Sequence, residues 1–404
     1  MKQHPSTNRS VSPRNVLSAV FGLVVGLILA LFLGELLVRA GLSVRTSRLE
    51  ASSQVEGPFV EYHPIRGFAL VPNANTHMAA SEYDVPVRIN HAGLRMDREI
   101  PEARTPGVQR VLFLGDSFTF GHGIDAPHRF TDLIQHDWPE AEILNFGVSG
   151  TGTDQELLHY REQGVRYSPD LVVLGYFVKC AKRNGELAIR TPRGWRPKPR
   201  FEVQGGELVL THVPVPDSLI SDPTDLESLR RHDDAVSSAK HFLRNHSRLY
   251  VFLRDDVNGA LQEGGSGGNY PEYDSARPEW QVTAAIVKEL ASEVRAHGSR
   301  FAVAFFPSLE EMQRGVSTRP RDQMRNLCAE LDVPFLDLLP VFLEQQNAAQ
   351  KVGQTLYFPI DRHWTVAGHA LAAKCLLPWV KAQLGTPLPV AETRESHREI
   401  VLTP

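Results

Sequence analysis

Residues 108–384 are predicted to form a three-layer α/β/α domain, in which a five-stranded, mainly parallel sheet lies between helices. Three observations carry this prediction. Short apolar runs of strand length alternate with longer amphipathic segments, a pattern typical of parallel sheets buried under helices. Turn residues such as Ser168-Pro169-Asp170 separate the segments. Thr153-Asp154 offers a capping side chain where a helix is expected to begin.

The expected elements follow one another as such a sheet requires. Strands are expected at 108–114, 142–146, 171–177, 301–306 and 333–338. Helices are expected at 127–136, from 153 onward, and at 280–297, 321–331 and 366–384. Roughly 120 residues separate the third and fourth strands, much more than an ordinary crossover needs. We interpret residues 181–279 as an insertion that caps the site and sets substrate choice; a surface elaboration unrelated to the site is the alternative.

The N-terminal segment combines a basic tail with a long apolar stretch. We predict a cytoplasmic tail at 1–15 and a transmembrane signal anchor at 16–34, with the remainder outside the membrane, in the periplasm if the cell has an outer membrane. A cleaved signal peptide is the alternative, although the candidate cleavage site Val38-Arg39-Ala40 is poor. A buried soluble helix is a third interpretation. Gly22 and Gly26 have the spacing of a helix-packing face, so a homodimer through them is a further hypothesis.

The remaining segments and the composition narrow the classes of function. Residues 35–107 are expected to form a stalk and one or two hairpins, and residues 385–404 a C-terminal tail. The net charge of −4 is small for 404 residues, which argues against a nucleic-acid partner. The three cysteines, Cys180, Cys328 and Cys375, lack metal-site spacing and are most simply small buried residues. Since no metal-binding or phosphate-binding motif is present, no metal or other cofactor is expected.

One tripeptide carries most of the chemical information. Gly115-Asp116-Ser117 follows the first expected strand and turns into Phe118-Thr119-Phe120-Gly121. A serine between a strand and a helix presents its hydroxyl beside free backbone N–H groups, which is half of an acyl-transfer site. The other half is a histidine with an orienting carboxylate, and Asp361-Arg362-His363-Trp364 supplies both. Because Thr119 replaces the second glycine of a Gly-x-Ser-x-Gly elbow, the pattern is not that of the α/β-hydrolases.

These motifs resemble those of the SGNH hydrolases, also called the GDSL family, over residues 108–384. Gly115-Asp116-Ser117 matches the first block of the family, and Asn145-Phe146-Gly147-Val148-Ser149-Gly150 is similar to the second, Asn-x-x-x-Ser/Ala-Gly. Asp361-Arg362-His363-Trp364 looks like the Asp-x-His-Trp version of the last block, as in membrane-anchored periplasmic esterases and polysaccharide O-acetyltransferases. The resemblance implies a flavodoxin-like sheet and acyl-ester chemistry.

The expected roles follow from these blocks. Ser117 is the expected nucleophile, His363 the general base, and Asp361 the group that orients His363 and stabilises its imidazolium. The backbone N–H groups of Ser117 and Gly150 are expected to form the oxyanion hole. Gly150 suits this role because a residue without a side chain lets the backbone approach substrate. Asp116 is expected to brace the turn.

One block departs from the family pattern. After the third strand the family carries Gly-x-Asn-Asp, whose asparagine donates a third oxyanion hydrogen bond, whereas by register that position is Cys180, a poor donor. Asn184 would replace it only if the loop were rearranged, and Lys179 or the substrate itself are further alternatives. Loss of one donor typically costs about 10²–10³ in turnover. A slower reaction and a loss of catalysis both stay open.

Three other residues near the motifs are candidates for the site. His122, in Gly121-His122-Gly123, is a candidate for binding substrate, with an ordinary loop histidine as the alternative. Trp364 is expected to pack beneath the base, with substrate contact as the alternative. His369 is a rival base, but it has no carboxylate at the short spacing of Asp361, so His363 is preferred.

The sequence leaves three functions open. The first is a membrane-anchored, extracytoplasmic serine esterase that removes an acyl group, with acetyl preferred, from a carbohydrate or small ester. The second is a polysaccharide O-acetyltransferase with the same residues, because water and a sugar hydroxyl are alternative acceptors for one acyl-enzyme. The third is a non-catalytic carbohydrate-binding or assembly protein on a degenerate SGNH fold, which Cys180 favours.

Overall fold

The computed structural model divides the chain into two compact units. It describes residues 22–23, 25–26, 29–39, 59–191, 194–220, 247, 249, 270–312, 316–351 and 353–385. One unit comprises residues 1–50 with 231–266 and the other residues 51–230 with 267–404, and each is described by itself. The predicted tail at 1–15, nearly all of the tail at 385–404 and part of the insertion at 181–279 lie outside the described residues.

The second unit is built on a five-stranded parallel sheet, which confirms the predicted fold class. The strand order is β13-β12-β7-β5-β6, and each neighbouring pair is parallel. The strands are β5 (Arg110–Gly115), β6 (Glu142–Gly147), β7 (Leu171–Phe177), β12 (Arg300–Phe306) and β13 (Phe335–Asp337). The three central strands, β5, β7 and β12, are almost wholly buried, as strands covered on both faces must be.

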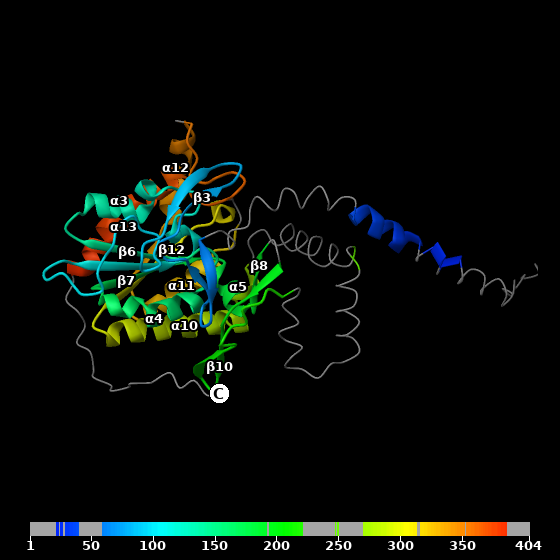
Figure 1. Cartoon of the computed structure of the whole chain (residues 1–404), viewed down its shortest axis with the longest axis horizontal. Helices are drawn as coiled ribbons and strands as arrows, with labels where there is room; N and C mark the ends of the chain where they lie inside the picture. The colour runs from blue at the N-terminus through cyan, green and yellow to red at the C-terminus, as the bar shows by residue number, and fades with distance from the viewer. Residues whose placement is uncertain are drawn as a thin grey trace, which may run out of the picture. The chain divides into compact units, whose positions relative to one another are not determined.

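Helices cover both faces of this sheet. Figure 1 shows α3 and α13 on one side and α4 and α10 on the other. The helices are α2 (Ser117–Phe120), α3 (Phe130–Asp137), α4 (Thr153–Glu162), α5 (Cys180–Gly185), α10 (Pro278–Ala296), α11 (Arg319–Glu330), α12 (Leu339–Lys351) and α13 (Val366–Gly385). Short 3₁₀ turns occur at Ala126–His128, Gly164–Tyr167, Pro271–Tyr273 and Glu310–Met312. The sequence did not predict α5 and α12, because α5 is short and the apolar residues of α12 gather at its start rather than in a periodic stripe.

Three glycines stand in register near the carboxyl ends of β5, β6 and β7. Gly115 of β5 pairs with Gly147 of β6 and with Gly175 of β7. A Cβ at Gly147 would lie 2.2 Å from the backbone nitrogen of Phe120, and one at Gly175 would lie 2.7 Å from the hydroxyl of Thr119. The missing side chains therefore let the short helix α2 sit directly on this edge of the sheet.

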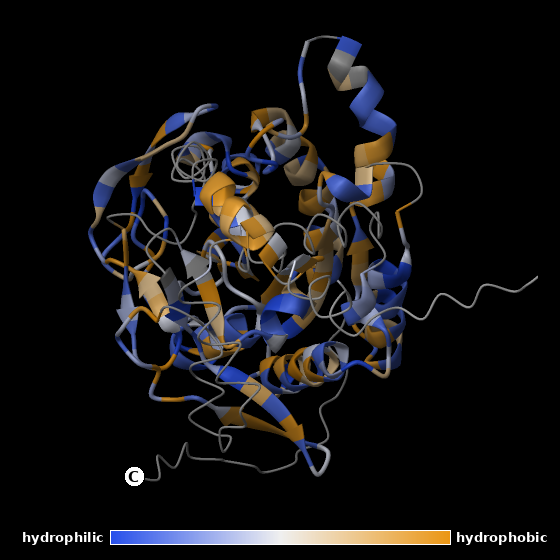
Figure 2. Ribbon diagram, turned by 90° about the vertical axis from the view of Figure 1, so that its right-hand side faces the viewer, coloured by the Kyte–Doolittle hydropathy of each residue, from blue (hydrophilic) through white to orange (hydrophobic). Residues whose placement is uncertain are grey.

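Antiparallel hairpins flank the sheet. They pair β1 (Val60–His63) with β2 (Gly67–Leu70), β3 (Asn75–Ala79) with β4 (Asp84–Arg88), β8 (Ala188–Thr191) with β9 (Gly194–Pro197), and β10 (Arg200–Gln204) with β11 (Glu207–Thr211). Along β10, hydrophilic and hydrophobic residues alternate, as Figure 2 shows for the hairpin at its lower edge. The first two hairpins share a small apolar core with Phe120 of α2. They therefore pack directly against the helix that carries Ser117.

The first unit is described only in part. Residues 22–23, 25–26 and 29–39 are helical, so the predicted span at 16–34 lies partly outside the described residues. Among the described residues, no helix combines the length and the apolar character that a bilayer crossing requires. A Cβ at Gly22 or at Gly26 would have no heavy atom of the described residues within 4 Å. The membrane span and the homodimer thus stay predictions.

Candidate functional site

The serine of the Gly-Asp-Ser turn begins α2 at the carboxyl end of β5. Asp116 is the N-cap, and its carboxylate accepts a hydrogen bond from the backbone N–H of Phe118 at 3.1 Å. A Cβ at Gly115 would lie 2.2 Å from the hydroxyl oxygen of Thr119, so this position requires glycine. The tight turn therefore fixes Ser117 as the first helical residue, at the edge of the sheet.

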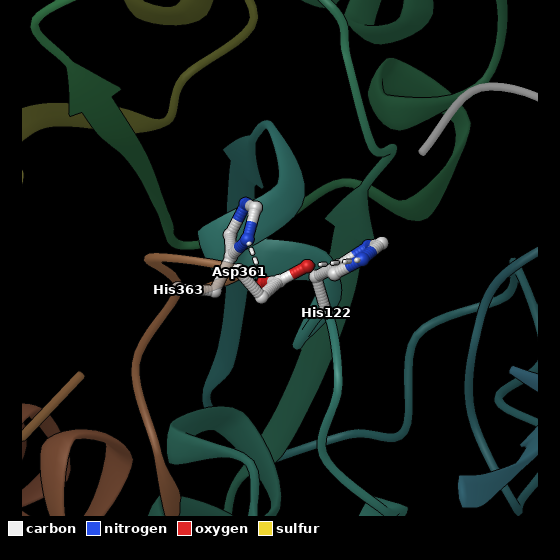
Figure 3. Close-up of side chains that lie close together, drawn as sticks. All are labelled: His122, Asp361 and His363. Atoms are coloured by element: carbon white, nitrogen blue, oxygen red, sulfur yellow. Dashed lines mark hydrogen bonds and ion pairs between the residues drawn. The ribbon is translucent and has the colours of Figure 1, made fainter. Parts of the chain in front are cut away.

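The structure brings the three predicted reactive side chains together. Ser117 Oγ lies 2.7 Å from Nε2 of His363, and Nδ1 of His363 lies 2.6 Å from Oδ1 of Asp361. Figure 3 shows the imidazole of His363 directed at the Asp361 carboxylate from the same loop, between α12 and α13. This serine–histidine–carboxylate arrangement is the geometry that nucleophilic acyl transfer requires.

Hydrogen bonds keep the carboxylate of Asp361 ionised. Burial alone would raise the pKa of Asp361, but hydrogen bonding and charge from His363, together with the hydroxyl of Tyr83, hold that pKa well below its usual range. An ionised Asp361 accepts the Nδ1–H of His363, which leaves Nε2 of His363 as the acceptor that faces Ser117. The hydrogen bonds thus select the tautomer that can take the serine proton.

Two backbone N–H groups, those of Ser117 and Gly150, are the predicted donors of the oxyanion hole. In the part of the chain that the structure describes, neither the N–H of Ser117 nor that of Gly150 donates a hydrogen bond. Gly150 has φ +86°, a backbone conformation that favours glycine. Asn145 supports this region, because its amide donates to the carbonyl of Thr119 at 2.8 Å and accepts from the N–H of Gly147 at 2.9 Å. Both N–H groups are therefore available to a substrate oxygen.

The proposed substitutes for the third oxyanion donor are engaged elsewhere. Asn184 donates both amide protons, to the hydroxyls of Thr153 at 2.6 Å and Thr283 at 2.8 Å, so it has none left for an oxyanion. Cys180 is fully buried, and burial raises the pKa of its thiol well above the usual value. Lys179 lies 3.7 Å from the carboxylate of Glu310. Contrary to the interpretation of Asn184 as a rearranged oxyanion donor, its side chain joins α4, α5 and α10.

Of the three remaining candidates, His122 lies beside the reactive residues, whereas Trp364 and His369 are buried in the packing around them. His122 is adjacent to the reactive residues, with its ring centroid 4.6 Å from that of His363. Trp364 is fully buried and packs against Phe118, with 4.8 Å between the ring centroids. Its ring therefore supports the residue that follows Ser117, and in this conformation it cannot contact substrate. His369 is buried against Phe130, whose backbone N–H donates to its Nδ1 at 3.3 Å, and burial lowers its pKa to about 3; His363, not His369, faces Ser117 Oγ.

Sequence reasoning missed three residues that contact the acid of the site or the turn that carries Ser117. The hydroxyl of Tyr83 donates to Oδ2 of Asp361 at 2.9 Å, and the carboxylate of Glu82 accepts from the backbone N–H of Asp361 at 2.7 Å. Arg183 donates to Oδ2 of Asp116 at 2.6 Å and to the carbonyl of Thr151 at 2.9 Å, which ties the nucleophile turn to the loop of Gly150. No local pattern identifies Tyr83 or Glu82, because each lies about 280 residues from its partner.

Among the described residues, one group could hold a metal ion. The ligand atoms of His122, Asp361 and His363 lie within 4.8 Å of one another. Two of these residues already use their ring nitrogen or carboxylate in the hydrogen bonds to Ser117 and to each other. A metal bound here would compete with the serine–histidine hydrogen bond, so the geometry fits acyl transfer better than metal-assisted hydrolysis.

Comparisons with known proteins find similarity at the level of structures alone. No protein-family model and no curated protein matches the chain. An acetyl xylan esterase structure is 12% identical and matches 67% of this chain and 99% of its own, with a TM-score of 0.36. A lipase/acylhydrolase from Enterococcus faecalis is 11% identical over 68% of this chain and 97% of its own, with a TM-score of 0.36. A member of the lipolytic G-D-S-L family from Veillonella parvula is 13% identical over 67% of this chain and 97% of its own, with a TM-score of 0.33.

Proposed function

We propose that this protein is a serine esterase that cleaves acyl esters, with acetyl esters as the first substrates to test. The observation that carries the proposal is the hydrogen-bonded series from Ser117 Oγ through His363 to Asp361, with distances of 2.7 and 2.6 Å. The N–H groups of Ser117, at the start of α2, and of Gly150, after β6, support it, because neither donates a hydrogen bond within the described part of the chain. The small-molecule ester and the acylated carbohydrate are both substrates of this chemistry.

The proposed reaction has two halves. Ser117 Oγ attacks the ester carbonyl while its proton passes to Nε2 of His363, and the carbonyl oxygen becomes an oxyanion held by backbone N–H groups. The tetrahedral intermediate collapses to an acyl-serine, and the proton on His363 goes to the leaving alcohol. Water then attacks the acyl-serine with His363 again as the base, which releases the acid and restores Ser117. Asp361 stabilises the imidazolium in both halves.

A polysaccharide O-acetyltransferase is the second candidate. Ser117 is fully buried and His363 is only 7% exposed, which restricts the access of water and of a sugar hydroxyl alike. Which acceptor the site binds beside the acyl-serine therefore decides between the two candidates. The chemistry of the first half-reaction is the same in both candidates.

Labelling with a fluorophosphonate tests whether Ser117 is a nucleophile. We expect the full-length protein to be labelled, Ser117→Ala to remain unlabelled, and the exposed control Ser275→Ala to be labelled like the wild type. Wild-type protein that resists labelling and releases no acetate from p-nitrophenyl acetate would instead favour a non-catalytic, carbohydrate-binding role. Mass spectrometry of a reaction with an acetylated donor and an oligosaccharide acceptor separates the two enzyme candidates: an acetylated acceptor rules out a pure hydrolase.

We also propose that residues 16–34 anchor the protein in a membrane with the reactive residues on the extracytoplasmic side. The support is the apolar sequence of this segment behind a basic tail. Alkaline carbonate extraction tests the anchor: full-length protein should stay in the membrane pellet, whereas a chain that begins at residue 59 should not. Release of the full-length protein by carbonate, or activity of a cytoplasmic reporter fused after residue 58, would contradict the proposal.

A further inference from the structure

The β3–β4 hairpin contacts the acid of the site although it lies outside the central sheet. Tyr83 directly precedes β4, and its carbonyl accepts the backbone N–H of Ala80 at 2.8 Å, which closes the turn. The Tyr83 hydroxyl donates to Oδ2 of Asp361 at 2.9 Å. The carboxylate of the neighbouring Glu82 accepts the backbone N–H groups of Ile360 at 3.1 Å and Asp361 at 2.7 Å. This turn therefore holds both the backbone and the side chain of Asp361.

The single proton of the Tyr83 hydroxyl fixes the tautomer of His122. Oη of Tyr83 lies 2.8 Å from Nε2 of His122. Because Tyr83 donates to Asp361, Nε2 of His122 must carry a proton and donate to Tyr83. Nδ1 of His122 is then an acceptor, and Oγ of Ser149 lies 3.4 Å from it. Burial, followed by the charge of His363, lowers the pKa of His122 well below its usual value, so the ring is neutral.

The hydrogen bonds form one consistent series through the site. Each donor is used once, and both carboxylate oxygens of Asp361 are occupied, Oδ1 by His363 and Oδ2 by Tyr83. In order, the series runs Ser149, His122, Tyr83, Asp361, His363, Ser117. Figure 3 shows Asp361 between the two histidines; its dashed line to His122 marks the 3.7 Å approach of Nε2 to Oδ2, and Tyr83, which is not drawn, makes the shorter contacts to both residues. Asp361, which accepts from His363, is thus itself held by Tyr83, and Tyr83 is held by His122.

Two glycines permit the close approach of His122 to Tyr83. Gly121 has φ +82° and Gly123 has φ +74°, in the region that side chains disfavour. A Cβ at Gly123 would lie 2.9 Å from the Tyr83 ring, so any larger residue would push Tyr83 away. The glycines on either side of His122 are therefore explained by the positive φ angles and by the close approach of Gly123 to Tyr83.

We propose that Tyr83 and His122 are positioning residues for the acyl-transfer reaction, an inference that rests on the proposed esterase or transferase function and deepens it. Tyr83 holds Oδ2 of Asp361, so Oδ1 stays aimed at Nδ1 of His363 while the imidazole gains and loses the serine proton. His122 holds the Tyr83 hydroxyl in place. Because His122 is neutral, its ring can lie 4.6 Å from that of His363 without repelling the imidazolium.

Steady-state kinetics of Tyr83→Phe tests this role in the full-length protein with a small acetyl ester. Loss of a hydrogen bond to a charged group should lower kcat by about 10–100-fold with little change in KM. The acidic limb of the pH profile should move to higher pH, because Asp361 then keeps more of its negative charge for the imidazolium. Tyr62→Phe is the matched control: Tyr62 lies in the β1–β2 hairpin, and its hydroxyl donates to the carbonyl of Val215 at 2.6 Å. It should leave kcat unchanged.

Variants at His122 provide a second comparison. His122→Leu removes the donor to Tyr83 and should lower kcat in the same manner as Tyr83→Phe. His122→Gln keeps an N–H donor and should retain more activity than His122→Leu. Equal loss in both His122 variants, with unaltered kcat in Tyr83→Phe, would overturn the inference and leave the proposed function intact.

A proton NMR spectrum gives a readout that needs no substrate. The Nδ1–H of His363, hydrogen-bonded to Asp361 at 2.6 Å, should resonate far downfield. We expect this resonance to shift in Tyr83→Phe and to stay in place in Tyr62→Phe. An unshifted resonance in Tyr83→Phe overturns the positioning role. If the resonance shifts in Tyr83→Phe but the wild-type protein neither labels at Ser117 nor turns over esters, the hydrogen-bonded series is supported while the proposed function is overturned.

Discussion

Asp361 and His363 face each other at 2.6 Å because the residue between them adopts a left-handed backbone conformation. Arg362 has φ +72°, and the backbone N–H of Phe358 donates to the carbonyl of His363 at 2.8 Å, which closes the loop. In an extended strand, residues two apart share a face but point in parallel rather than at one another. The loop therefore stores a costly conformation in order to pair acid and base.

Replacing Arg362 tests this relationship. Arg362→Val should lower the free energy of unfolding by about 1–3 kcal/mol, because a β-branched side chain disfavours positive φ. It should also slow fluorophosphonate labelling of Ser117 by about tenfold or more, because Asp361 is then misplaced. Arg362→Gly is the matched control. It relieves the strain and loses only the exposed contact to Glu310 at 2.7 Å, so labelling should stay near the wild-type rate. Equal labelling rates in both variants would show that the conformation of residue 362 is unimportant.

Asn184→Ala distinguishes a structural role from an oxyanion role. Removal of the buried amide leaves the partners at Thr153 and Thr283 without its hydrogen bonds, so the free energy of unfolding should fall by about 2–3 kcal/mol. Labelling of Ser117 in the folded protein should be unaffected. Urea unfolding and labelling kinetics measure the two effects. A large loss of labelling rate at full stability would return Asn184 to the oxyanion hole.

Arg183→Met tests the ion pair behind the nucleophile. Asp116 is fully buried, and Arg183 donates to it at 2.6 Å, so loss of the guanidinium leaves a buried carboxylate unpaired. The free energy of unfolding should fall by about 3–5 kcal/mol. Asp116→Asn in the same chain removes the unpaired charge and should recover part of this loss. A double-mutant cycle from urea unfolding gives the coupling, and strict additivity would mean that the two side chains do not interact.

Glu156→Gln tests a buried acid on α4. Burial, then the negative charge of Asp116, raises the pKa of Glu156 well above its usual value of 4.5, so the folded protein holds it neutral. In the unfolded chain it ionises above about pH 4.5, so the unfolded state binds fewer protons and wild-type stability falls as pH rises. Glutamine cannot ionise. Its stability advantage should grow as the pH rises above about 4.5, and an advantage that is constant with pH would contradict this.

Local patterns predicted most of the fold. The five strands were anticipated because buried parallel strands are continuous apolar runs, and β7 was anticipated at its full length, Leu171–Phe177. Short or weakly periodic helices were missed: α5 has only six residues, and the second half of α12 is polar. Gly115-Asp116-Ser117 and Asp361-Arg362-His363 were found because each keeps its chemistry within three consecutive residues.

Roles that depend on distant partners were not accessible in this way. The sequence suggested Asn184 as a donor to the oxyanion, but its amide protons go to Thr153 and Thr283, the latter 99 residues further along. Trp364 was a candidate for substrate contact, yet packing against Phe118 buries it completely. The sequence alone therefore determined the order of the strands along the chain and singled out Ser117, His363 and Asp361 as candidates for nucleophile, base and acid, since these are local signals. Only the tertiary structure decided that Tyr83 serves Asp361, because a hydrogen bond across 278 residues leaves no periodicity or motif to read.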